Sequence, residues 1–228
     1  MKKLKQLYAS LIENLAKKGE NYFEDELTIF SASAGTDYNG KIMIVGRAVN
    51  GWNHYLDPRS ERSVQECICS IQNALGVESL DWVKTQWGSK EKYNTKKSAF
   101  WRLSKAISAI ANPSVEFHTD SIVWTNLYKA AKESGGNPSE RLMNVQFDHC
   151  KKILDEEISF YRPEVIIFLT GLNWAKDFLT NATRREINGD LEYVELVGTY
   201  QKCKYIVGQH PQGKNEAIHL KEITGHLN

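Results

Sequence analysis

Four apolar residues in succession, Ile42 to Val45, are the feature that most restricts how this chain of 228 residues can fold. An unbroken apolar run that ends at a glycine, here Gly46, is typical of a strand buried on both faces, as in the middle of a parallel sheet. Three further central strands are predicted, at 121–126, 165–169 and 205–207. Helical patterns separate these strands. The sequence therefore predicts an α/β fold, a three-layer α/β/α sandwich around a central, mostly parallel, four-stranded sheet.

Helices are predicted where apolar residues recur at helical spacing. They cover residues 2–18, 63–75, 100–112, 139–161 and 214–226, with a short helix after Gly171. Residues 27–31 and 191–197 are predicted as further strands, and residues 198–201 as a turn. A chain of this length suits one domain. We therefore expect a single domain over residues 1–228, with the helix of residues 1–20 packed on it.

Composition excludes few classes of function. The hydrophobic fraction of 41% and the charged fraction of 25% are typical of a soluble globular protein. A net charge of +1 argues against binding to nucleic acid through bulk charge alone, although it leaves room for a local basic groove. No apolar run approaches the roughly 20 residues that span a membrane, and the N-terminus lacks the core of a signal peptide. We expect a cytoplasmic protein with no membrane contact.

The cysteines give little support for a metal centre. Cys67, Cys69, Cys150 and Cys203 contain no C-x-x-C pair, and reduced cytosolic thiols are the simpler interpretation. His149 and Cys150 are adjacent on a predicted helix, where neighbouring side chains face different directions. We expect neither a metal nor a cofactor.

Residues 81–102 combine lysines with aromatic rings. Such a stretch can follow a nucleic-acid backbone and stack bases. The alternative is a lysine-rich surface loop whose rings face the core. The cationic and aromatic residues are Lys84, Lys90, Lys92, Lys96, Lys97, Arg102, Trp82, Trp87, Tyr93, Phe100 and Trp101.

Polar clusters follow three of the predicted strands, at Gly46–Trp52, Asn126–Lys129 and Gly208–Gly213. In a parallel sheet these clusters would lie at one edge, where open α/β sheets bind ligands. The amide of Asn126 can donate and accept together, as the edge of a nucleobase requires. Each cluster also has a purely structural interpretation: an ordinary turn, an asparagine that caps a turn, or a histidine hydrogen-bonded for stability.

His210 is the most specific residue of the three clusters. Pro211 restricts the turn that follows the last strand and would hold the imidazole outward. A histidine in that position can donate a hydrogen bond to a developing oxyanion.

Taken together, these motifs resemble those of the uracil-DNA glycosylase superfamily. Val45-Gly-Arg-Ala-Val-Asn-Gly51 is similar to the family's first motif, and Trp124-Thr-Asn-Leu-Tyr-Lys129 to its asparagine strand. Arg162–Gly171 is similar to the family's strand and glycine before a helix, and Gln209-His-Pro-Gln212 to its last motif. The resemblance covers roughly residues 40 to 220.

The resemblance implies a flipped base and hydrolysis of its glycosidic bond, as in base-excision repair. Asn126 would read the base, Trp52 or Tyr55 would stack on it, and Gly46 and Arg47 would complete the base site. His210 would stabilise the charge that develops on the base. Asn50 would position water. Phosphates of DNA would meet Lys129, Gln212, Lys214, Lys96 and Lys97. We expect DNA, single- or double-stranded, as the partner of a monomer.

The first and last motifs depart from the family pattern. Val49 stands where proline is usual, Ala48 and Arg47 stand where acidic or amide side chains are usual, and Gln212 replaces serine. Asn50 takes the water-positioning role only if the turn is offset. A second hypothesis is therefore a module that binds nucleic acid or a nucleotide without cleaving it. A third is hydrolysis of a small nucleoside or nucleotide. Arg47 would favour a phosphate or an acidic ligand.

Overall fold

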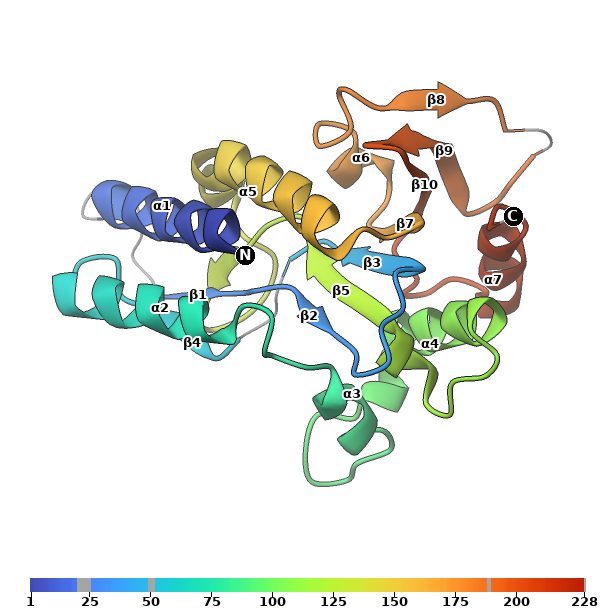
Figure 1. Cartoon of the computed structure of the whole chain (residues 1–228), viewed down its shortest axis with the longest axis horizontal. Coiled ribbons are helices and arrows are strands. Elements are labelled where there is room, and N and C mark those ends of the chain that lie inside the picture. The colour runs from blue at the N-terminus through green and yellow to red at the C-terminus, as the bar shows by residue number, and fades with distance from the viewer. Residues whose placement is uncertain (20–25, 49–51, 188–189, 228) are drawn as a thin grey trace. The chain divides into compact units, whose positions relative to one another are not determined.

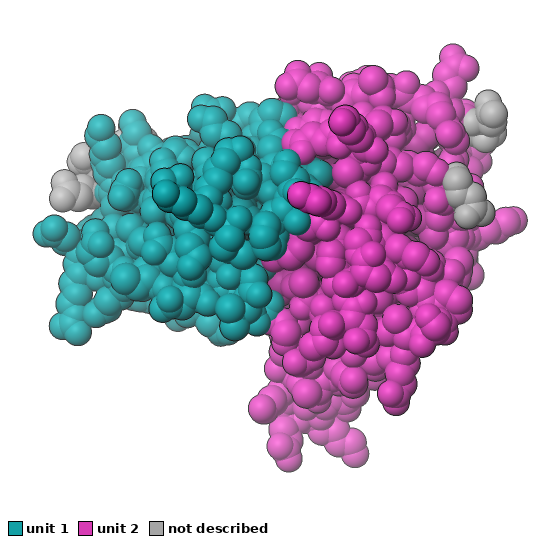
Figure 2. All heavy atoms as spheres, in the orientation of Figure 1, with its two compact units in different colours: residues 1–32, 46–78, 125–160 teal, residues 33–45, 79–124, 161–228 magenta. Residues whose placement is uncertain are grey.

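A computed structural model describes residues 1–19, 26–48, 52–187 and 190–227 (Figure 1). The described residues form two compact units, coloured separately in Figure 2. Unit 1 contains residues 1–32, 46–78 and 125–160, and unit 2 contains residues 33–45, 79–124 and 161–228. Each unit is assembled from three separate segments of the chain. The expectation that the chain folds as one domain stays a prediction.

The larger sheet lies mostly in unit 2. Among the described residues it has seven strands, in the order β2 (Ser33–Ala34), β5 (Ile122–Asn126), β3 (Ile42–Gly46), β7 (Val165–Leu169), β10 (Cys203–Gly208), β9 (Val194–Tyr200) and β8 (Thr183–Arg185). The last residue of β3 and the last two of β5 belong to unit 1. The chain is of the α/β class, as the sequence predicts.

The four predicted strands are all present and are neighbours in the middle of this sheet. The expected four-stranded, mostly parallel sheet needs correction, since the described sheet has seven strands and contains both parallel and antiparallel pairs. β3, β7 and β10 are parallel, whereas β2 pairs with β5, β9 with β10 and β8 with β9 in antiparallel fashion. The additional strands β2 and β8 are only two and three residues long, too short for a pattern of apolar residues to reveal.

Apolar side chains explain the central strands. Every residue of β3, β5 and β7 is buried, as expected for strands covered on both faces. The helices of unit 2 are α3 (Asp81–Thr85), η1 (Thr95–Lys97), α4 (Ala99–Ala111), η2 (His118–Ser121), α6 (Leu172–Ala175) and α7 (Glu216–Thr224). The side chain of Arg102 on α4 pairs with that of Glu216 on α7, which joins these two helices.

Unit 1 contains the helices α1 (Lys2–Gly19), α2 (Glu61–Ala74) and α5 (Glu140–Tyr161, without its last residue). It also contains a small antiparallel sheet of β4 (His54–Leu56), β1 (Leu27–Ile29) and β6 (Ala130–Lys132), with β1 in the middle. Its middle strand β1 confirms the strand predicted at residues 27–31, although it ends at Ile29. β4 and β6, each of three residues, were not predicted.

Helix α1 confirms the predicted amphipathic helix. Its apolar stripe is buried: Leu4, Tyr8, Leu11, Ile12 and Leu15. In Figure 1 it runs beside α5, and two hydrogen bonds join the helices. The Tyr8 hydroxyl donates to Oε1 of Glu157 over 2.8 Å, and Nδ2 of Asn14 donates to the carbonyl of Val145 over 3.0 Å.

The predicted turn at residues 198–201 is wrong in most of its length, since β9 continues to Tyr200. The chain reverses at Gln201 and Lys202, whose φ angles are 48° and 71°. Gly198 lies inside β9, at a point where neighbouring atoms come too close for any side chain. A Cβ there would lie 1.9 Å from the carbonyl oxygen of Thr183 and 2.8 Å from the ring of Tyr205.

Replacing Gly198 with alanine should therefore destabilise the protein. The obstacle is the backbone of β8, which cannot rotate away as a side chain could. We therefore expect the free energy of unfolding to fall by at least about 1–3 kcal/mol. Urea denaturation compares Gly198→Ala with Thr199→Ala, an exposed position on the same strand. Equal stabilities of the two variants would contradict this explanation.

Candidate functional site

The three polar clusters predicted from the sequence fall in different units. Gly46, Arg47, Trp52, Tyr55 and the segment 126–129 belong to unit 1, whereas His210, Gln212 and Lys214 belong to unit 2. Asn50, predicted to position water, lies outside the described residues, as do its neighbours Val49 and Gly51.

Within unit 1 the first motif and the asparagine segment are joined directly. The backbone N–H of Leu127 donates to the carbonyl of Gly46 over 2.9 Å, and that of Tyr128 donates to the carbonyl of Arg47 over 3.0 Å. The two motifs, about eighty residues apart in the sequence, thus form one backbone-bonded turn region. This contact brings the residues that follow β3 and β5 together. The expected convergence of all three clusters on one ligand stays a prediction.

Asn126 is the last residue of β5. Its side chain is only 1% exposed, and its Nδ2 atom has no hydrogen-bond partner among the described residues. An unsatisfied buried donor costs roughly 1–3 kcal/mol, so such a group calls for an explanation. An amide held for an acceptor that arrives with a ligand provides one.

Lys129 requires a correction. Its side chain has no exposed surface, and its ammonium lies 2.8 Å from Oε2 of Glu157. The same Nζ atom donates to Oγ1 of Thr125 over 2.6 Å and to the carbonyl of Asn126 over 2.7 Å. An ammonium enclosed in this way cannot meet a phosphate of DNA. It fixes the backbone that carries Asn126 instead.

A second buried residue, which sequence reasoning missed, holds the next part of this turn. Oε1 of Gln146 on α5 accepts from the backbone N–H groups of Lys129 over 3.1 Å and Ala130 over 2.8 Å. Its Nε2 atom donates to the carbonyl of Ala130 over 2.9 Å. The only sequence signal is a glutamine at a core-facing helix position, which is unusual but not specific.

The two aromatic candidates for stacking lie in different environments. Trp52 is half-buried and packs edge-to-face on Phe30, with ring centroids 5.2 Å apart. Tyr55 is 42% exposed on β4, whose neighbours His54 and Leu56 face inward. A hydrogen bond to the carboxylate of Glu26 raises the pKa of Tyr55 to about 12. Tyr55 therefore remains a neutral ring on the surface.

In unit 2, His210 follows the end of β10 as predicted. Val45 of β3 and Val207 of β10 both pair with Phe168, so these parallel strands end at the same edge of the sheet. The backbone N–H of Gln212 points to Nδ1 of His210 over 3.4 Å. An Nδ1 atom that accepts leaves the hydrogen of the neutral ring on Nε2, which is then a donor.

Behind this turn lies a second histidine that the sequence did not single out. His219 on α7 is fully buried, and neither ring nitrogen has a hydrogen-bond partner among the described residues. A Cβ at Gly208 would lie 2.8 Å from its Nε2 atom, so the glycine makes room for the ring. Burial lowers the pKa of His219 to about 4; Glu222 opposes this shift, and Lys214 and His210 add to it.

Residues 81–102, the basic and aromatic segment, contain both a buried ring and exposed cationic or aromatic side chains. Trp101 is 3% exposed and packs edge-to-face on Trp82 and Trp124, at centroid distances of 5.3 and 5.0 Å, which confirms the core role for this ring. Tyr93 is 58% exposed. Lys96 and Lys97 are also exposed, and their carbonyls accept hydrogen bonds from the Arg102 guanidinium over 2.9 and 2.8 Å.

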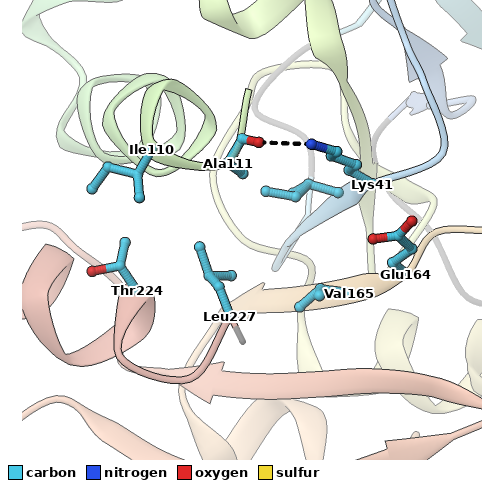
Figure 3. Close-up of a pocket in the computed structure, with 8 residues that line it drawn as sticks. Lys41, Ile110, Ala111, Glu164, Val165, Thr224 and Leu227 are labelled. Atoms are coloured by element: carbon cyan, nitrogen blue, oxygen red, sulfur yellow. Dashed lines mark hydrogen bonds between the residues drawn. The ribbon is translucent and has the colours of Figure 1, made fainter. Parts of the chain in front are cut away.

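Unit 2 also contains a cavity of about 230 Å³, shown in Figure 3. It lies at the amino ends of β3 and β7, lined by Lys41 and Glu164 and by the ends of α4 and α7. Nζ of Lys41 donates to the carbonyl of Ala111 over 3.0 Å (Figure 3). None of the residues predicted for the base site lines this cavity.

Among the described residues there is no group of three or more His, Cys, Asp and Glu side chains that could hold a metal ion. Within the same residues, no helix has the length and apolar character needed to cross a membrane. A scan against models of known protein families finds no match, and a search of curated proteins finds no significant similarity.

Removing one partner of the enclosed Lys129–Glu157 pair should destabilise the protein. Lys129→Met should lower the free energy of unfolding by about 3–5 kcal/mol, because it leaves a buried carboxylate without its counter-charge. Adding Glu157→Gln should recover part of this loss, which urea denaturation would measure. Lys152→Met, an exposed position on α5, is the control and should change stability by less than about 0.5 kcal/mol. Similar losses for Lys129→Met and the control would contradict this account.

The lowered pKa of His219 leads us to expect that the folded protein loses stability in acid. Its pKa of about 4 in the folded protein lies below the value of about 6.5 expected in the unfolded chain. The unfolded state therefore binds more protons between these values, and stability falls as the pH is lowered from about 6.5 to 4, by up to about 3 kcal/mol. Thermal unfolding of wild type and His219→Phe across this range tests the prediction. Identical pH dependence in both proteins would show that His219 does not contribute.

Proposed function

We propose that this chain is a DNA N-glycosylase-like enzyme that hydrolyses the glycosidic bond of a flipped uracil or a related damaged base. The observation that carries the proposal is Asn126. Its buried amide has a donor with no partner in the part of the chain that the structure describes, and backbone hydrogen bonds hold its segment beside the first motif. We further propose a uracil-DNA glycosylase-like α/β/α architecture, and a monomer that acts on DNA in the cytoplasm.

Asn126 would contribute recognition. Its Nδ2 donor needs an acceptor, and its Oδ1 atom can accept from an N–H group of the base, so the amide suits a base with a carbonyl beside an N–H. Lys129 and Gln146 hold the backbone on either side of the turn, which limits the entropy lost when a ligand binds. Trp52 or Tyr55 would stack on the flipped base, beside Gly46 and Arg47.

His210 would contribute to the chemical step. Departure of the base leaves negative charge on it, and an N–H group held in position stabilises such charge. The hydrogen bond from Gln212 to Nδ1 favours the tautomer with the hydrogen on Nε2, the form needed for donation. Asn50 would position the water. Gln212, Lys214, Lys96 and Lys97 are the remaining candidates for contacts to phosphate.

Ala48 favours a second candidate, a non-catalytic module that binds nucleic acid or a nucleotide. Many members of the resembled family carry at this position a side chain that acts on water, and a methyl group cannot do so. With the same amide and the same cations, such a chain would bind without cleaving. Nucleic-acid binding would weaken steeply with salt, whereas binding of a small nucleotide would depend little on it.

The test is base release from single- and double-stranded oligonucleotides that carry uracil, hypoxanthine, xanthine or oxidised pyrimidines, scored as alkali-labile abasic sites. We expect His210→Ala to slow release by about 10²–10³-fold, as for the loss of an oxyanion donor. Asn126→Ala should slow it by roughly 10- to 100-fold, the equivalent of one buried hydrogen bond.

His149→Ala and Asn144→Ala, two substitutions on α5, are the matched controls and should leave release unchanged. Release that persists in both His210→Ala and Asn126→Ala would rule out this mechanism. Salt-sensitive binding of every oligonucleotide with no release from any would favour the non-catalytic module.

A further inference from the structure

Unit 1 contains a second chemically organised cluster, and none of its members is assigned to the proposed base site. Oγ of Ser70 lies 2.7 Å from Nδ1 of His54, and Nε2 of His54 lies 3.6 Å from Oε2 of Glu78. His54 is on β4, Ser70 is in the last turns of α2, and Glu78 follows that helix. A serine becomes an active nucleophile when a base lies within hydrogen-bond reach of its hydroxyl and a third group orients that base.

Glu78 lies on the Nε2 side of the His54 ring and favours the tautomer with the hydrogen on that nitrogen. A carboxylate oxygen can only accept, so the nitrogen that faces it, Nε2, bears the hydrogen of the neutral ring. Nδ1 then carries the lone pair, and the hydrogen bond of 2.7 Å requires Ser70 to donate its hydroxyl hydrogen to it. This is the direction of proton transfer that a general base needs.

The carboxylate is itself held in place. The hydroxyl of Ser31 donates to Oε2 of Glu78 over 3.0 Å, the same oxygen that faces His54. Nε2 of His54 has no hydrogen-bond partner among the described residues, so nothing there competes with Glu78. The separation of 3.6 Å is slightly longer than a hydrogen bond. Such contacts often tighten only when substrate binds.

His54 is the most buried residue of the cluster, and Ser70 is the most exposed. His54 is 6% exposed and the side chain of Glu78 is 19% exposed, whereas Ser70 is on the surface. The base is therefore shielded from water while the nucleophile is accessible. An exposed helical serine commonly bonds to a carbonyl of its own helix, as Ser159 does to Asp155 over 3.0 Å. Ser70 is bonded to a histidine of a neighbouring strand instead.

We infer that Ser70 is a base-activated nucleophile that accepts the acyl group of an activated ester. Oγ of Ser70 attacks the carbonyl carbon as its proton passes to Nδ1 of His54, and the bond to the leaving alcohol breaks as the alcohol takes that proton. Water then attacks the acyl-serine in the same manner, which releases the carboxylic acid and restores Ser70. Glu78 stabilises the imidazolium that forms in each step.

The position of Ser70 defines the substrate class. Because Ser70 lies within α2, the backbone N–H groups around it point along the helix to its own carbonyls and form no oxyanion hole. Without that stabilisation, the reaction is restricted to esters with a good leaving group, such as aryl esters of small acids.

The probe for this reaction is p-nitrophenyl acetate, and all measurements are made in the Cys69→Ala background because Cys69 is an exposed thiol next to the serine. Release of p-nitrophenol gives the turnover, and mass spectrometry of acid-quenched protein gives the acetylation of each serine. Ser159, on the surface of α5, is the internal control serine.

We expect acetylation of Ser70 to be at least about 100-fold faster than that of Ser159, the usual contribution of a general base. Ser70→Ala, a surface change, should remove the release of p-nitrophenol. Glu78→Gln should slow acetylation of Ser70 by about 100-fold while leaving Ser159 unchanged. Equal rates at Ser70 and Ser159, or an unchanged rate in Glu78→Gln, would overturn the inference. Neither result depends on glycosylase activity.

Discussion

The buried pair of Lys129 and Glu157 is the interaction on which the organisation of unit 1 depends. Its ammonium bonds to Thr125 and to the carbonyl of Asn126 at the end of β5, and its carboxylate accepts from Tyr8 on α1. One charged pair thus ties a strand end to two helices. Removing either partner would leave an uncompensated charge in the interior, which is far more costly than losing a surface contact. The same pair that stabilises this unit also fixes the backbone of the residue proposed to read a base.

A comparable arrangement supports the turn that carries His210 in unit 2. The ring of His219 occupies the space that a side chain at position 208 would need, so only glycine fits there. The carboxylate of Glu222 accepts hydrogen bonds from the backbone N–H groups of Glu192, Tyr193 and Val194. Helix α7 therefore contacts the end of β10 and the start of β9 through its polar residues as well as through its apolar ones. In both units, buried polar groups lie directly behind the residues proposed to contact a ligand.

The central strands could be predicted because their signal is local. Ile42–Val45 and Val165–Leu169 are continuous apolar runs, and the structure buries all of them. The short strands β4 and β8 carry no such signal: all three residues of β8 are exposed, and β4 begins with a histidine. The role of Lys129 was mistaken for a different reason. Its partner Glu157 is 28 residues away, and nothing in the sequence shows that both face the same interior.

The motifs that follow β3 and β5 could be predicted from the sequence, whereas their joining depends on these two strands being neighbours in the sheet. Gln146, His219 and the cluster of Ser70, His54 and Glu78 could not be predicted. These depend on helix faces and on contacts between distant segments, which one sequence does not specify. Sequence reasoning therefore finds the motifs at strand ends, and the structure supplies the groups that support them.

The central claim is that the amide of Asn126, whose Nδ2 atom has no hydrogen-bond partner among the described residues, recognises the edge of a base. The most direct measurement is the side-chain amide resonance of Asn126, assigned by its loss in Asn126→Ala, during titration with uracil, hypoxanthine and xanthine. We predict a saturable shift of this resonance with one of these bases, because the Nδ2 donor gains an acceptor. A resonance that stays unchanged with every base, while the protein remains folded, would contradict the claim.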